Sequence, residues 1–183
     1  MSLQTWEEAL YCSVADATQI SNTTTETIMV PDTSIPAKYW YVGRTLKATL
    51  IGSASCVVTT PGTLTLRARY GGVAGTVLAA SAAIALNITA QTSDTVWIEF
   101  LLTCRAVGWS STSGSLWTTG RAMLGSLRTG GTQVTDMIPN SANAVVASLD
   151  LTSAGTLSFT AQFSVSTNPT NLTINQFTLE ALN

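Results

Sequence analysis

The chain has 183 residues, of which only 10% are charged, and its net charge is −2. An average domain has about 25% charged residues, so this surface must be covered largely by Thr, Ser, Asn, Gly and Ala. The slightly acidic balance supplies no basic surface for a phosphate backbone, and nucleic-acid binding is not expected. The sequence contains no histidine, which excludes Ser–His–Asp triads, Cys–His pairs and His-ligated zinc sites.

The length fits one folded domain over 1–183, in which 1–8 are a candidate N-terminal arm. The first residues lack a basic segment followed by an apolar run, so no signal peptide is expected. The most apolar stretch, 75–90, is too short and too interrupted to cross a bilayer. We therefore expect a soluble protein that is made in the cytoplasm and has no membrane contact.

The N-terminal third combines strand candidates with an aromatic connection. Strands are expected over 9–17 and 25–30, although the first of these begins in a segment that also permits one helical turn. Residues 31–43 form an extended connection that contains the triplet Tyr-Trp-Tyr at 39–41. Consecutive side chains on an extended chain cannot all face inward, so at least one ring must seek a surface or a partner. A regular strand with alternating apolar residues follows over 44–52.

A turn and a strand then bring two arginines onto one face. Pro61-Gly62 suits the centre of a type II turn and precedes a strand over 63–70. Arg67 and Arg69 are two residues apart, so they share a face of that strand. One interpretation is a grip on an anionic partner. The other is a solvated strand face, paired across the sheet with a residue such as Glu99.

The clearest strand in the sequence covers 95–105. Five apolar residues alternate there with polar ones: Val96, Ile98, Phe100, Leu102 and Cys104. Leu101 is the exception on the polar face. If the strands that carry Cys56 and Cys104 are neighbours, the two thiols can lie close together. No residue near either thiol in sequence is placed to activate it, since alternation sends Arg105 to the opposite face from Cys104. We expect the thiols of all three cysteines, Cys12, Cys56 and Cys104, to be reduced and packed as small apolar groups.

Two tryptophans lie in the polar segment 108–120, "GWSSTSGSLWTTG". Exposed aromatic rings in a polar loop are typical of binding surfaces, because a rigid ring provides contact area at low entropic cost. The alternative is that Trp109, Trp117 or both cover the end of the hydrophobic core. A strand is expected over 115–124, which begins inside this segment.

Strands over 155–166 and 171–181 bring the number of candidates to about eight. Short strands at regular spacing, separated by Gly, Pro and Asn turns, predict an all-β antiparallel β-sandwich. The favoured topology is a jelly roll, and the alternative is an immunoglobulin-like sandwich.

No arrangement of residues predicts catalysis. The carboxylates are scattered, without the spacing of a calcium loop. A pair such as Asp94 and Glu99 keeps a carboxylate hydrolase as the least favoured hypothesis. We therefore expect a protein that is not an enzyme and that has no catalytic, cofactor-binding or metal-binding residues.

Four stretches together resemble a family of tailed-bacteriophage virion structural proteins: "IPAKYWYVGRTLK" (35–47), "SCVVTTPGT" (55–63), "LLTCRAVG" (101–108) and "LTINQFTLEALN" (172–183). The resemblance covers most of the chain and rests on sheet-and-turn motifs. It implies a jelly-roll decoration (cement) protein that binds the major capsid protein, stabilises the capsid shell and assembles as a homo-trimer on the virion surface. Phage tails and fibres use similar modules, so a receptor-binding module for a host surface glycan is the alternative.

Under the decoration hypothesis, the partner contacts are expected from the N-terminal segment, the aromatic triplet, the arginine pair and the tryptophan loop. The residues are Trp6, Tyr39, Trp40, Tyr41, Arg67, Arg69, Trp109 and Trp117.

Overall fold

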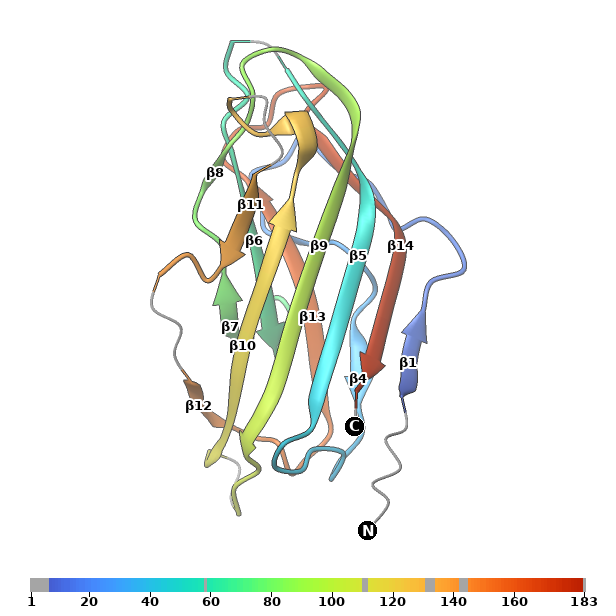
Figure 1. Cartoon of the computed structure of the whole chain (residues 1–183), viewed down its shortest axis with the longest axis vertical. Helices are drawn as coiled ribbons and strands as arrows, with labels where there is room; N and C mark the ends of the chain where they lie inside the picture. Colours follow the sequence, from blue (N-terminus) through green and yellow to red (C-terminus); the bar gives the residue numbers. More distant parts are fainter. Residues whose placement is uncertain (1–6, 58, 110–111, 131–133, 142–144, 183) are drawn as a thin grey trace.

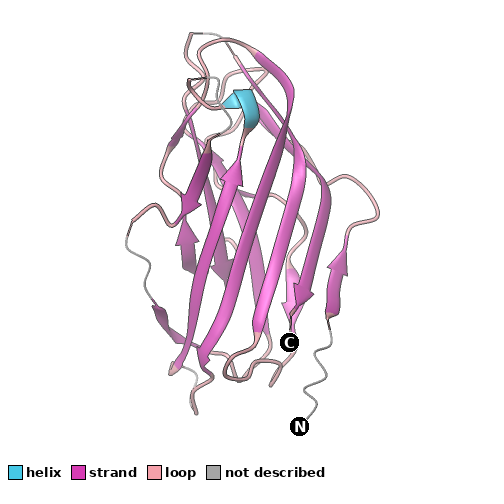
Figure 2. Ribbon diagram, viewed as in Figure 1, coloured by secondary structure: helices cyan, strands magenta, loops and turns pink. Residues whose placement is uncertain are grey.

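The computed structural model describes residues 7–57, 59–109, 112–130, 134–141 and 145–182. These residues form two antiparallel sheets that lie one behind the other (Figure 1). Apart from one 3-10 turn, η1 (Gly125–Leu127), all of their regular structure is strand (Figure 2). The expected all-β antiparallel sandwich is confirmed. The described part of the chain contains no helix long and apolar enough to cross a membrane.

Sheet A is the front layer in Figure 1, and its strand order is β1-β14-β5-β9-β10-β11. Two short strands extend it: β2 (Ile20–Ser21) pairs with β14, and β12 (Val145–Leu149) pairs with β10. The bounds of the main strands are β1 (Glu8–Cys12), β5 (Thr45–Cys56), β9 (Gln91–Ala106), β10 (Gly114–Met123), β11 (Thr135–Ile138) and β14 (Asn171–Ala181).

Sheet B lies behind sheet A, with the strand order β3-β13-β6-β7. Two further strands pair at its margins: β4 (Thr33–Ile35) with β13, and β8 (Ile84–Ala85) with β6. The bounds of the main strands are β3 (Thr27–Ile28), β6 (Thr63–Tyr70), β7 (Thr76–Ala80) and β13 (Gly155–Phe163).

All eight expected strands overlap an observed strand, because their period-two apolar pattern is what a half-buried strand requires. The expected inward residues of β9 are fully buried. Sequence reasoning missed β7 and β8, whose alanine-rich segment has no clear period. It also missed β11 and β12, which are short and largely exposed.

The core is the layer between the sheets. Phe159 of sheet B lies 5.3 Å from Phe100 and 5.7 Å from Phe177, measured between ring centroids, and both of these rings belong to sheet A. All three rings are essentially inaccessible to solvent. Aromatic pairs at such distances stabilise a fold by more than their buried area alone accounts for. The three rings therefore join the two layers at the centre of the molecule.

One expectation about β13 is wrong. The alternation of Ser158 and Thr160 with apolar residues predicts that both side chains point into solvent, yet both are buried. They do lie on the outer face of sheet B, but the segment 21–32 flanks β13 through the edge strand β3, and its acidic side chains reach over both hydroxyl groups. Ser158 Oγ donates to Asp32 Oδ1 at 2.6 Å, and Thr160 Oγ1 donates to Glu26 Oε1. We call residues 21–32 the strap.

Candidate functional site

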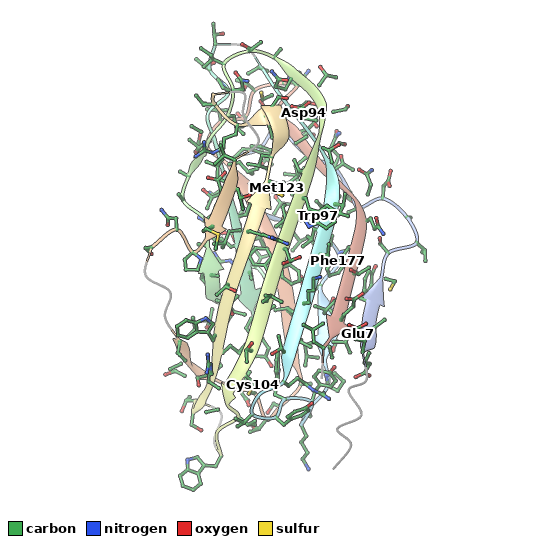
Figure 3. The ribbon with its side chains drawn as sticks, in the orientation of Figure 1. Glu7, Asp94, Trp97, Cys104, Met123 and Phe177 are labelled. Carbon is green, nitrogen blue, oxygen red and sulfur yellow. The ribbon has the colours of Figure 1, made fainter. Side chains whose placement is uncertain are left out.

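Several of the expected binding residues lie at one end of the sandwich. The connection from β4 to β5 contains the aromatic triplet and is tied to the end of β9. Gly43 N donates to Cys104 O at 2.8 Å, and Cys104 N donates to Arg44 O at 2.8 Å. Figure 3 places Cys104 at the lower end of sheet A, where the turn from β9 to β10 also lies (Figure 1). We define the aromatic end as Tyr39, Tyr41, Arg44, Arg105, Trp109 and Trp117.

Arg44 organises the first half of the aromatic end. Its guanidinium carbon lies 4.1 Å from the ring centroid of Tyr39 and 4.3 Å from that of Tyr41. Its Nη1 also donates to the carbonyl oxygen of Tyr39 at 2.9 Å. A cation stacked on two rings holds them in fixed orientations. Tyr41 is 44% exposed, so a rigid aromatic surface faces solvent here.

Tyr39 connects the aromatic end to the first strand. Its hydroxyl donates to Glu8 Oε2, at the start of β1, over 3.1 Å. Burial raises the pKa of Tyr39 to about 12, and the neighbouring Glu8 adds to this effect against the opposing charge of Arg44. The hydroxyl therefore stays protonated and remains a hydrogen-bond donor to Glu8 at neutral pH.

Trp40 does not belong to this surface, although it was expected among the partner contacts. Its side chain is 3% exposed and packs in the hydrophobic core. The argument that three consecutive rings cannot all face inward is confirmed: Trp40 turns in, and Tyr41 turns out. Which ring turns in depends on the packing of this connection against the core, and the sequence contains no signal for it.

The two tryptophans of segment 108–120 occupy different environments. Trp109 is 95% exposed in the turn between β9 and β10, so it does not cover the core. Trp117 lies within β10, opposite Thr103, and is half-buried. The Arg105 guanidinium carbon lies 5.3 Å from the Trp117 ring centroid. Trp117 is therefore a strand residue near the tip, and Trp109 is the exposed ring.

Arg67 and Arg69 pair with Glu26 of the strap, and the pairing with Glu99 suggested from the sequence is wrong. Arg69 Nε and Nη2 donate to Glu26 Oε1 and Oε2 at 2.6 and 2.8 Å, and Arg67 Nη1 lies 3.2 Å from Glu26 Oε2. Arg67 also donates to the side chain of Gln162. Glu99 instead lies between Lys47 and Arg121 on sheet A. The charges of both arginines are thus satisfied within the chain.

The electrostatics of Glu26 follow from this arrangement. Burial raises the pKa of its carboxyl group, but hydrogen bonds from Arg69 and Thr160 and the charges of Arg67 and Arg69 outweigh burial. The net result is a pKa below the ordinary value. Sequence reasoning missed this role, because the pairing of β3 with β13, which brings Glu26 beside the arginines, is a long-range contact that no local pattern encodes.

The cysteines show no sign of a reactive site. β5 and β9 are neighbouring strands. Cys56 lies opposite Gln91 at one end of this strand pair, and Cys104 lies beside Arg44 at the other end. The two thiols are therefore far apart, although their strands are neighbours. Burial raises the pKa of both thiols, which keeps them protonated. Both are packed as apolar groups, as expected, whereas the same expectation is wrong for Cys12, which is exposed at the end of the edge strand β1.

The carboxylate-hydrolase hypothesis gains no support from the positions of its two residues. Asp94 and Glu99 are five residues apart on one strand, so their Cα atoms are separated by about 16 Å. The two carboxyl groups of glycosidases are about 5–9.5 Å apart. Among the described residues, no group of three His, Cys, Asp or Glu side chains is placed to hold a metal ion.

Trp6, another expected contact, lies outside the described residues. Sequence reasoning missed Arg44 and Arg105 as parts of the aromatic end. The proximity of Arg44 to the aromatic triplet was a usable signal for the first of them. No protein-family model matches this chain, and no curated protein matches it in sequence.

Proposed function

We propose that this protein is a non-enzymatic structural component of a tailed-phage virion, a decoration protein that binds the major capsid protein and stabilises the capsid shell. The observation that carries the proposal furthest is the aromatic end. Solvent-exposed Trp109 and Tyr41 project there from a sandwich in which several other charged groups form ion pairs within the chain. Rigid aromatic side chains and arginines are the residues that dominate protein–protein contacts.

The position of the first strand also supports this proposal. The hydrogen bond between Tyr39 and Glu8 places the start of β1 beside the aromatic end. Glu8, which lies in the described part of the expected N-terminal arm 1–8, is therefore beside the ring of Tyr39. An arm and a rigid surface at the same end of a module can engage one partner together, which raises the affinity through effective concentration.

We also propose that the sandwich is a jelly roll with an added hairpin. Its first and last strands, β1 and β14, are neighbours in sheet A, and most connections outside the hairpins cross between the sheets. Without β10, β11 and β12, sheet A reads β1-β14-β5-β9, and sheet B reads β3-β13-β6-β7. This is the nested strand order that two overlapping Greek keys produce. The hairpin is inserted between β9 and β13.

The decisive experiment is to measure the copy number of the protein on purified heads by quantitative mass spectrometry. A decoration protein is expected in a fixed ratio to the major capsid protein, and heads that lack it should lose heat stability and regain it when purified protein is added. A few copies confined to the tail would overturn the proposal.

A paired substitution locates the contact. Trp109→Ala is expected to weaken binding to undecorated heads at least about 10-fold, as for a central aromatic contact. Ile88→Ala is the matched control, because Ile88 is also exposed but lies in the connection from β8 to β9. Equal binding by the two variants would exclude Trp109 from the contact.

The extreme exposure of Trp109 also favours a second candidate function, a tail or fibre module that binds a host surface glycan. An exposed indole ring in a polar turn is able to stack on a sugar face. Binding of wild-type protein to a glycan array, lost in Trp109→Ala, would support this function. An absence of array binding, together with unchanged phage adsorption for Trp109→Ala, would dispose of it.

A further inference from the structure

Exposed apolar side chains gather on the outer face of sheet A, away from the aromatic end. Trp97 and Met123 are opposite each other on β9 and β10 and are 42% and 38% exposed. Figure 3 shows both on the face of the front sheet that is turned toward the viewer. Met137 on β11 is 60% exposed and lies opposite Arg121. Contiguous exposed apolar surface of this kind marks interaction sites. We call this half of the sheet, over β9, β10 and β11, the apolar face.

A shallow hollow continues the apolar face. It is lined by Leu101 and Met137 together with Thr119, Gly120 and the ion pair of Arg121 with Glu99. Leu101 is the apolar residue that breaks the alternation of β9 on its outward side. A leucine is favourable at this outward position if a partner covers the apolar face and buries its side chain.

Charge differs across sheet A among the residues that the structure describes. The β1–β14 edge carries carboxylates at Glu7, Glu8 and Glu180. The apolar face carries Arg121, whose side chain is 52% exposed beyond its contact with Glu99. Between the two halves, Lys47 lies 3.6 Å from Glu99. One edge of the sheet is therefore acidic, and the opposite half combines apolar residues with a cation.

We propose that the apolar face of one copy of this chain packs against the β1–β14 edge of a second copy, which deepens the homo-oligomer of the proposed function. Complementary charge favours this arrangement over the packing of two apolar faces against each other. In that alternative, Arg121 of one copy would lie near Arg121 of the other. A contact between two different surfaces is heterologous, and it forms a ring when the rotation that relates neighbouring copies closes. Three strands over eight residues present about 380 Å² in projection, roughly half of the about 800 Å² that each partner buries in standard interfaces.

The strand register provides a direct test. A single row of paired residues crosses all six main strands, from Cys12 at the acidic edge to Met137 on the apolar face; its members are Cys12, Thr178, Thr49, Glu99, Arg121 and Met137. Five strand spacings separate its ends, so they lie about 24 Å apart within one chain. In a ring whose axis follows the strands, this row lies at the same level in every copy. Cys12 of one copy then approaches Met137 of the next.

The experiment uses Met137→Cys with native Cys12 and a bifunctional maleimide shorter than the intramolecular span. Cys12 is exposed, whereas Cys56 and Cys104 are buried. The proposal expects cross-linked dimers and higher multimers, which disappear when Cys12→Ser is added. Ile88→Cys is the control and should yield none. A multimer ladder that persists with Cys12→Ser, or an equal ladder from Ile88→Cys, overturns the proposed contact.

Native mass, measured by sedimentation, gives a second readout. Met137→Glu places a carboxylate against an acidic edge and should weaken association at least about 10-fold more than Met137→Lys. Equal weakening, or a wild-type protein that is monomeric, overturns the inference. If the protein is monomeric but still binds heads in a fixed ratio, the proposed contact between copies is refuted and the proposed function is not. Oligomers that do not bind heads would refute the proposed function alone.

Discussion

Within the strap, Glu26 is the carboxylate that pairs with both Arg67 and Arg69, so Glu26→Gln is the substitution that isolates the contribution of this ion pair. Glu26 is 15% exposed and accepts a two-point contact from Arg69, in addition to contacts from Arg67 and Thr160. Gln preserves the shape of the side chain but removes the charge and leaves two partly buried guanidinium groups without a counter-ion. Hydrogen bonds to charged groups contribute about 1.5–3 kcal/mol. We expect a loss of about 2–3 kcal/mol in the free energy of unfolding at pH 7, or about 5–10 °C in Tm for a domain of this size.

The pH dependence of this loss follows from the lowered pKa of Glu26. The unfolded chain binds this proton more readily than the folded chain, so the stabilisation is complete above the unfolded pKa, near 4.5. It is lost as the pH falls through the lower folded value. The difference between wild type and Glu26→Gln should therefore be full at pH 7 and shrink below about pH 4.

Urea unfolding followed by tryptophan fluorescence between pH 7 and pH 3 measures this difference. Asp16→Asn is the control, because it removes one negative charge from an exposed loop. A Glu26→Gln effect as small as that of the control would refute the argument that Glu26 anchors the strap. So would an effect that does not change between pH 7 and pH 3.

Three further predictions test the core and the thiols. A thiol reagent should label Cys12 rapidly in the native protein, and Cys56 and Cys104 only after denaturation, since burial keeps these two protonated and covered; rapid native labelling of three thiols would contradict this. Phe159→Ala should cost about 3–5 kcal/mol in urea unfolding, because it empties the centre of the core; a cost below about 1 kcal/mol would contradict the packing. Gly52→Ala should prevent soluble expression or lower Tm strongly, since its Cβ would meet the Thr173 carbonyl oxygen of β14; a native Tm would refute that close approach.

The strap shows where reasoning from the sequence reaches its limit. Arg67 and Arg69 were correctly placed on one face of a strand, because that follows from the period of the strand itself. Their partner was not identified, because Glu26 is 41 residues before Arg67 in the chain and no local pattern links the two. The burial of Ser158 and Thr160 has the same origin. Alternation indicates which face a residue is on, whereas coverage of an outer face depends on another segment.

The candidate surface divides in the same way. The sequence indicated that the aromatic triplet and the polar tryptophan segment were unusual. The structure brings Tyr41 and Trp109 to one end, because β5 and β9 are neighbours and the residues before β5 lie beside the end of β9. It also turns Trp40 into the core and places Trp117 within a strand.

The sequence by itself determined the all-β class, the overlap of eight strands with their expected positions, and the inward face of the longest of them. Each depends on backbone geometry and side-chain polarity within a few residues, where the period of two is imposed locally. The tertiary structure alone decided which strands pair, which outer faces are covered, and that Cys56 and Cys104 lie at opposite ends of adjacent strands. Those features depend on contacts between residues distant in the chain, whose free energy is spread over the whole core and leaves no local signal.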